Sequence, residues 1–206
     1  MHPWRARLER WFTPAARHSP LTPNQITLTA LSLNLVAAIV LGLARHRPDL
    51  FLAAPAILAI AGLLDAFDGI VARVRGLANP YGDFLDHLCD RISDTTLLAG
   101  FLYGTSVRPS LGYAALIAVI MTGYAGTQIE ATFRKRSYEG LGRGEFVLGL
   151  FILPIVAWIL ARLDLLTRRF GALTIPEWLI GIVTLLAIYT VISRARRARS
   201  YEESGG

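Results

Sequence analysis

The sequence predicts an all-α fold, in which a bundle of six transmembrane helices follows an amphipathic helix that lies in the membrane interface. Of its 206 residues, 53% are hydrophobic and only 17% are charged, and the mean hydropathy is +0.46. Because soluble domains carry about 25% charged residues, this composition disfavours a soluble fold. One transmembrane helix needs about 20 apolar residues, so a chain of this length has room for at most six to eight spans with short connections.

The spans are predicted from runs of residues without charge. Residues 21–44 contain no charged side chain, and neither do residues 110–129, 146–161 and 178–193. Residues 50–64 are also uncharged, and Asp65 then begins an acidic stretch. We therefore expect a single membrane domain over residues 1–206, with spans near 21–44, 50–74, 83–107, 110–133, 145–162 and 175–193.

The third span is chemically unusual. Its apolar run, residues 95–107, is too short to cross a bilayer by itself. It can span the membrane only if the acidic stretch 82–94 forms the other half of the same helix. We expect this arrangement.

Residues 1–19 are predicted to form the interfacial helix. Four large apolar side chains recur there at helical spacing, opposite a charged face, and they are Trp4, Leu8, Trp11 and Phe12. Pro20 and Pro23 then break the chain, and we expect Asn24 to cap the first span.

The basic residues predict the orientation of the bundle. With the N-terminus inside, fourteen of the 21 Lys and Arg residues lie in cytoplasmic segments, six lie in external ones, and Arg91 lies within the third span. This asymmetry places both termini and the acidic stretch on the cytoplasmic side of the plasma membrane. We expect the net charge of +6 to face anionic lipid headgroups and not a nucleic acid.

Six carboxylates fall within thirty positions, namely Asp65, Asp68, Asp83, Asp86, Asp90 and Asp94. A charge at the centre of a transmembrane helix costs about 2.5 to 3.5 kcal/mol, so a cation is needed to compensate. Helical spacing places Asp65 and Asp68 on one face of their helix, and Asp86 and Asp90 on one face of the next. Four carboxylates that converge suit a hard divalent ion such as Mg²⁺, Mn²⁺ or Ca²⁺, which leaves coordination positions for a phosphoanhydride substrate.

The same stretch contains the pattern D-x2-D-G-x2-A-R-x8-G-x3-D-x3-D. Its eight fixed positions are filled, without a change in spacing, by Asp65, Asp68, Gly69, Ala72, Arg73, Gly82, Asp86 and Asp90. This pattern resembles the signature of the CDP-alcohol phosphatidyltransferase family. The six-span layout and the segment 23–27 at the start of the first span resemble the family too.

The resemblance implies an enzyme that moves a phosphatidyl or archaetidyl group from a CDP-linked lipid to a small alcohol and releases CMP. It implies that two divalent ions, Mg²⁺ or Mn²⁺, are held by Asp65, Asp68, Asp86 and Asp90, and that Asp90 is also the general base. Contacts with the CDP-linked lipid are expected from Asn24, Thr27, Gly69, Arg73 and Gly82.

Outside the pattern, His87 and Asp83 are expected to have supporting roles, and Asp94 is expected to pair with Arg91. We also expect a homodimer.

The acceptor alcohol is less well defined by the sequence. Arg134, Lys135, Arg136 and Arg143 are predicted in the same cytoplasmic layer as the metal ligands, where they can bind an anionic acceptor such as inositol phosphate or glycerol phosphate. These residues are equally consistent with contacts to lipid headgroups. Serine or another amino alcohol remains an alternative acceptor.

Two other classes of protein also place carboxylates in a membrane. Ion-coupled transporters do so, but they usually contain repeated halves, and this chain contains no repeat. Prenyltransferases that act on a diphosphate need two Asp-rich motifs and more spans. The sequence therefore favours the transferase.

Overall fold

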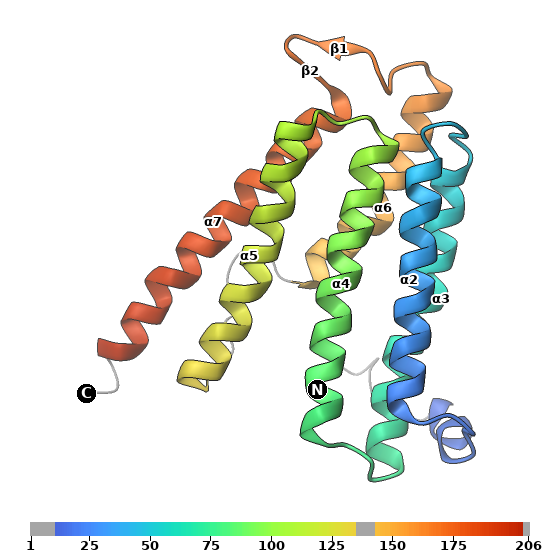
Figure 1. Cartoon of the computed structure of the whole chain (residues 1–206), viewed down its shortest axis with the longest axis vertical. Coiled ribbons are helices and arrows are strands. Elements are labelled where there is room, and N and C mark those ends of the chain that lie inside the picture. The colour runs from blue at the N-terminus through green and yellow to red at the C-terminus, as the bar shows by residue number, and fades with distance from the viewer. Residues whose placement is uncertain (1–10, 135–142, 204–206) are drawn as a thin grey trace.

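The computed structural model describes residues 11–134 and 143–203. Within these ranges, a short helix at residues 11–17 precedes six long helices, and a hairpin of two short strands lies between the last two helices (Figure 1). The elements are α2 (Pro23–Leu43), α3 (Leu50–Val74), α4 (Pro80–Gly104), α5 (Pro109–Phe133), α6 (Arg143–Arg162), β1 (Arg169–Phe170), β2 (Leu173–Thr174) and α7 (Ile175–Glu203).

Five of the described helices, α2, α3, α5, α6 and α7, are long and apolar enough to cross a membrane. The remaining long helix, α4, has 25 residues but carries the acidic stretch. It packs against α2, α5 and α6, and it joins the acidic stretch to the following apolar run in one continuous helix, as expected. The predicted all-α membrane bundle is thus confirmed.

Several boundaries differ from the predicted spans. Helix α4 begins at Pro80 because Asn79 caps it: the Asn79 side chain accepts a hydrogen bond of 3.0 Å from the Gly82 amide. Helix α7 continues to Glu203, ten residues beyond the predicted end, because no Gly or Pro interrupts residues 194–203. The β1–β2 hairpin was not predicted.

The expected cap of α2 was wrong. Thr22 is the N-cap, and it forms a capping box with Gln25, whose side chain accepts a hydrogen bond of 2.9 Å from the Thr22 amide. Asn24 lies one position inside the helix, after Pro23. Its side chain is therefore available for contacts outside the cap.

Two glycines allow α4 to approach α2 closely. A Cβ atom on Gly100 would collide with the carbonyl oxygen of Ala38, and one on Gly104 would collide with that of Leu41. The two backbones can lie this near to each other only because both side chains are absent. This contact holds the C-terminal half of α4 against the C-terminal half of α2.

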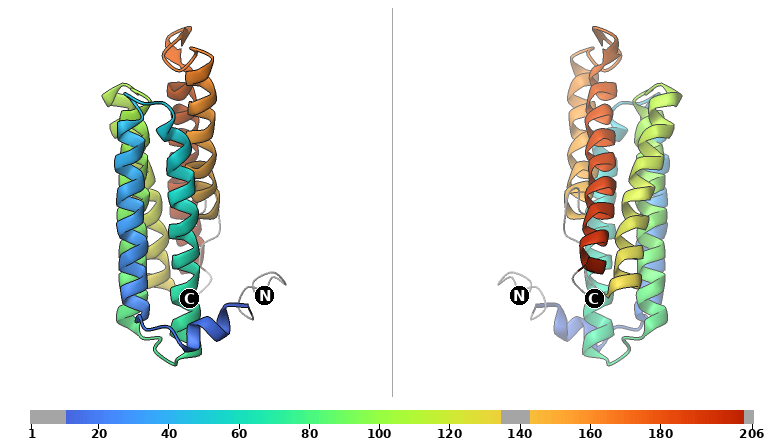
Figure 2. Two further views of the ribbon diagram at one scale, coloured as in Figure 1. Left: turned by 90° about the vertical axis from the view of Figure 1, so that its right-hand side faces the viewer. Right: turned by 90° about the vertical axis from the view of Figure 1, so that its left-hand side faces the viewer.

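The described part of the N-terminal segment lies across one end of the bundle (Figure 2). Phe12 makes an edge-to-face contact with Phe67 of α3, with ring centroids 5.9 Å apart, and Ala16 is fully buried. Arg75 donates hydrogen bonds of 3.1 Å to the carbonyl oxygens of Ser19 and Leu21. Trp4 and Leu8 of the predicted interfacial helix lie outside the described residues.

The hairpin lies at the opposite end of the bundle from the loop between α3 and α4 (Figure 1). There Arg108, the residue before α5, forms an ion pair of 2.8 Å with Glu177 in the first turn of α7. Arg108 also donates a hydrogen bond of 2.8 Å to the carbonyl oxygen of Ala172 between the two strands. These contacts join α5, the hairpin and α7.

Candidate active site

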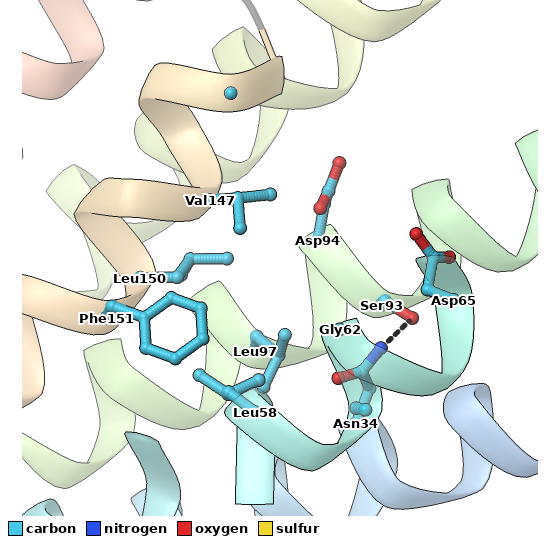
Figure 3. Close-up of a pocket in the computed structure, with 12 residues that line it drawn as sticks. Asn34, Leu58, Gly62, Asp65, Ser93, Asp94, Leu97, Val147, Leu150 and Phe151 are labelled. Atoms are coloured by element: carbon cyan, nitrogen blue, oxygen red, sulfur yellow. Dashed lines mark hydrogen bonds between the residues drawn. The ribbon is translucent and has the colours of Figure 1, made fainter. Parts of the chain in front are cut away.

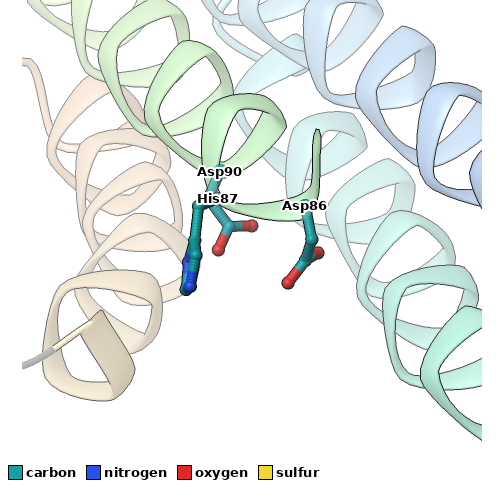
Figure 4. A group of neighbouring side chains, drawn as sticks. All are labelled: Asp86, His87 and Asp90. Carbon is teal, nitrogen blue, oxygen red and sulfur yellow. The ribbon is translucent and has the colours of Figure 1, made fainter. Parts of the chain in front are cut away.

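The ends of α3 and α4 that meet at their connecting loop carry the acidic cluster. Asp65, Asp68 and Asp86 each place one carboxylate oxygen within 4.8 Å of the other two. A second group with the same spacing consists of Asp86, His87 and Asp90 (Figure 4). The structure therefore brings the four signature carboxylates together from two helices, as the helical spacing predicts.

Burial differs among these carboxylates. Asp68 and Asp90 are 7% and 5% exposed, whereas Asp65 and Asp86 are half-buried. The hydroxyl of Thr27 on α2 donates a hydrogen bond of 2.5 Å to Oδ2 of Asp68. This neutral donor orients the carboxylate but does not cancel its charge. Clustered carboxylates in a membrane bundle gain most from a bound cation, because a cation offsets their repulsion and their desolvation.

The donor set fits a divalent cation. All four signature side chains offer oxygen, the ligand type that Mg²⁺ and Mn²⁺ prefer. His87 is exposed beside Asp86 and Asp90, and a ring nitrogen of His87 lies within 4.8 Å of a carboxylate oxygen of each. His87 is therefore close enough to the cluster to contribute more than a structural role. The acidic cluster can therefore bind metal.

The residues expected to contact the CDP-linked lipid lie on three helices around this cluster. The Asn24 side-chain oxygen is 3.4 Å from the position that a Cβ of Gly82 would take, so the starts of α2 and α4 are in contact. On α3, the exposed Arg73 turns back along its own helix, and its guanidinium lies 3.3 Å from the corresponding position on Gly69. Asn24, Thr27 and Gly82 thus lie near one another, with Gly69 and Arg73 on the neighbouring helix.

The four basic residues proposed for the acceptor are only partly described. Arg134 is exposed and ends α5 with a left-handed backbone, φ 54°. Arg143 begins α6, but its side chain is not among those described, and Lys135 and Arg136 lie outside the described residues. Their assignment to an acceptor remains a prediction.

A cavity of about 410 Å³ adjoins the cluster, and the sequence did not predict it (Figure 3). Asp65 belongs to its lining, together with residues from α2, α4 and the beginning of α6. Among them, Asn34 donates a hydrogen bond of 3.0 Å to the Ser93 hydroxyl. The sequence indicates this cavity only weakly, through single polar residues within apolar runs.

The family model that describes CDP-alcohol phosphatidyltransferases matches residues 20–189. The chain belongs to the CDP-alcohol phosphatidyltransferase family. It is therefore a membrane-bound transferase of phospholipid synthesis. This result excludes the two alternatives considered from the sequence, an ion-coupled transporter and a prenyltransferase. The chain is also confirmed as a multi-pass membrane protein.

Several relatives cover most of this phosphatidyltransferase. The archaetidylinositol phosphate synthase of Pyrococcus horikoshii is 30% identical over 90% of this chain and 87% of its own. The inner membrane protein YnbA of Escherichia coli is 31% identical over 85% and 83% of the two chains. The phosphatidylinositol phosphate synthase of Mycobacterium marinum is 27% identical over 91% and 82%.

Solved structures share the fold of this phosphatidyltransferase. The phosphatidylinositol phosphate synthase of Mycobacterium tuberculosis with CDP-DAG bound superposes with a TM-score of 0.67 at 22% identity, covering 92% of this chain and 94% of the other. The same enzyme in complex with manganese and citrate gives a TM-score of 0.66 over 90% and 88% of the two chains.

Proposed function

We propose that this phosphatidyltransferase moves the phosphatidyl or archaetidyl group of a CDP-linked lipid to an inositol phosphate and releases CMP. The observation that carries the reaction is the convergence of Asp65, Asp68 and Asp86 from two helices within the complete family signature. The acceptor is inferred from the relatives, several of which are named archaetidylinositol or phosphatidylinositol phosphate synthases. The basic residues around the α5–α6 connection are compatible with an acceptor that carries a phosphate.

Asp65, Asp68, Asp86 and Asp90 are the residues that would hold two divalent ions, Mg²⁺ or Mn²⁺. When bound, these ions supply positive charge that stabilises the diphosphate and the departing CMP. Manganese in a related structure supports this choice of metal. Thr27 keeps one carboxylate of the set, Asp68, in a fixed orientation through its 2.5 Å hydrogen bond.

Asp90 is the proposed general base. It removes the proton from the acceptor hydroxyl, whose oxygen then bonds to the phosphorus that carries the lipid. The bond from that phosphorus to the CMP oxygen breaks, and CMP leaves with the electron pair. Burial of Asp90 at 5% exposure limits the access of water, which would compete with the acceptor alcohol.

The CDP group is proposed to lie across the starts of α2 and α4. Gly82 has no side chain, and the side chains of Asn24 and Asn79 lie 3.4 to 3.9 Å from the position that its Cβ would take, so a nucleotide can approach the helix beside these two amides. On α3, the absence of a side chain on Gly69 leaves room for the Arg73 guanidinium, which can donate paired hydrogen bonds to a phosphate.

We further propose that the site faces the cytoplasm, that the protein resides in the plasma membrane, and that it forms a homodimer. The excess of basic residues at the end with the acidic cluster supports this orientation. One relative is named an inner membrane protein, which supports the location. Chemical crosslinking in the native membrane tests the dimer.

The reaction is tested with the full chain in lipid vesicles. Radiolabelled CDP-linked diacyl and CDP-linked diether lipids are each supplied with inositol phosphate, glycerol phosphate, serine or ethanolamine in the presence of Mn²⁺. We expect CMP release and a phosphorylated lipid product with inositol phosphate. Product formed with glycerol phosphate, serine or ethanolamine but not with inositol phosphate would overturn the proposed acceptor. Comparison of the diacyl and diether donors identifies the lipid.

A further inference from the structure

The cavity next to Asp65 has two chemically different walls (Figure 3). One wall is polar and consists of Asn34, Asp65, Ser93 and Asp94, whereas the opposite wall is apolar and includes Val147, Leu150 and Phe151 of α6. Its volume of about 410 Å³ falls within the range of about 300 to 1,000 Å³ that is typical of small-molecule sites. A ligand with a hydroxyl-bearing face and a hydrocarbon face fits such walls.

Asp94 is the charged group of the polar wall that the proposed metal set does not use. It is 4% exposed, and Arg91 of the same helix contacts it at 3.1 Å, which confirms the predicted pair. Because Arg91 already matches its charge, Asp94 is better suited to accept hydrogen bonds from neutral hydroxyls than to bind a second cation. This favours a polyol over the ammonium group of an amino alcohol.

The Arg91–Asp94 pair is held in place by its neighbour on α5. The Arg91 guanidinium occupies the space where Gly123 lacks a side chain, so a Cβ atom there would collide with it. Beside this pair, the hydrogen bond from Asn34 to Ser93 fixes two neutral polar groups. The polar wall is therefore arranged before any ligand arrives, which lowers the cost of binding.

We propose that this cavity binds the hydroxyl-bearing body of the acceptor and that Asp94, with Asn34 and Ser93, selects a phosphorylated polyol. This inference rests on the proposed function and names the residues that recognise its acceptor. Asp65 is common to the cavity and the acidic cluster, so a ligand in the cavity lies next to the proposed metal site. Gly144 lines the other end and directly follows Arg143, one of the residues proposed for the acceptor phosphate.

The test compares Asp94→Asn with Asp164→Asn, which makes the same chemical change at an exposed position in the α6–β1 connection. Asp164 has φ 53°, a backbone that Asn also adopts readily. We expect Asp94→Asn to raise the KM for inositol phosphate about 10- to 100-fold, with the KM for the CDP-linked lipid unchanged. The effect on glycerol phosphate should be smaller, because that acceptor offers fewer hydroxyls. Asp164→Asn should leave the KM values for inositol phosphate, glycerol phosphate and the CDP-linked lipid unchanged.

A second variant changes the space and not the charge. Val147→Phe on the apolar wall narrows the cavity, so it should also raise the acceptor KM selectively, and it carries the test if Asp94→Asn does not fold. Suppose that the wild-type enzyme uses inositol phosphate but that the variants raise the KM values for both acceptors and for the CDP-linked lipid to the same extent. This result would overturn the cavity assignment and leave the proposed function in place. A wild-type enzyme that does not use inositol phosphate would overturn the proposed function itself.

Discussion

The Thr27 hydroxyl of α2 donates a 2.5 Å hydrogen bond to Oδ2 of Asp68 on α3, and it also contacts the carbonyl oxygen of Pro23 at 3.0 Å. Thr27 and Asp68 are 41 positions apart in the sequence. Their contact joins the first turns of α2 to the family signature. Since both residues are buried, the contact lies in a place where hydrogen bonds contribute most.

Replacement of Thr27 with Val should weaken the binding of divalent ions. Val has the same shape but no hydroxyl, so Asp68 loses a donor in a buried position, which costs about 1 to 3 kcal/mol. We expect a higher Mn²⁺ concentration at half-maximal activity and a lower Tm. Thr27→Ser, which keeps the hydroxyl, is the matched control, and equal behaviour of the two variants would contradict the role of the hydrogen bond.

Replacement of Asp90 with Asn should abolish CMP release while the protein remains folded. The amide is close in size to the carboxylate but cannot accept the proton of the acceptor hydroxyl, and general base catalysis is worth about 100- to 10,000-fold. Single-turnover release of labelled CMP measures the effect, and the Tm checks the fold. Asp164→Asn, at an exposed position in the α6–β1 connection, is the comparison. Near-normal turnover of Asp90→Asn would remove the general-base assignment.

Replacement of Gly100 with Ala should destabilise the bundle. The added methyl group would collide with the carbonyl oxygen of Ala38, so α2 and α4 must separate, at a cost of about 1 to 3 kcal/mol. Gly149→Ala in α6 is the control, because among the described residues no atom outside the neighbouring backbone of α6 lies within 4 Å of the position that its Cβ would take. Thermal unfolding in detergent should show a lower Tm for the first variant only, and an unchanged Tm would mean that the close α2–α4 contact is not required.

The sequence predicted the helices well because uncharged runs of about 20 residues have few alternatives in a membrane protein. It also predicted the acidic cluster, since helical spacing and a short loop between α3 and α4 bring Asp65, Asp68 and Asp86 together. Capping was harder: Thr22 and Asn24 are both good N-cap residues, and only the structure shows which one adopts the extended backbone.

The cavity could not be predicted for a different reason. Asn34 and Ser93 are separated by 59 positions, and a single polar residue in an apolar run does not indicate which other helix it faces. Asp94 is similar, because its sequence neighbourhood predicts the contact with Arg91 but not the cavity that it shares with α6. Contacts between distant helices depend on packing, which in this bundle depends on glycines such as Gly100 and Gly123.

The last prediction concerns the basic residues between α5 and α6. If Arg134, Lys135 and Arg136 bind the acceptor phosphate, their joint replacement with Ala should raise the KM for inositol phosphate far more than that for the CDP-linked lipid. Each lost charged hydrogen bond is worth about 1.5 to 3 kcal/mol, so an increase of at least 100-fold is expected. Arg168→Ala and Arg169→Ala remove charges near the hairpin, at the other end of the bundle, and serve as controls. An equal rise in both KM values would mean that the basic residues contact lipid headgroups and do not recognise the acceptor.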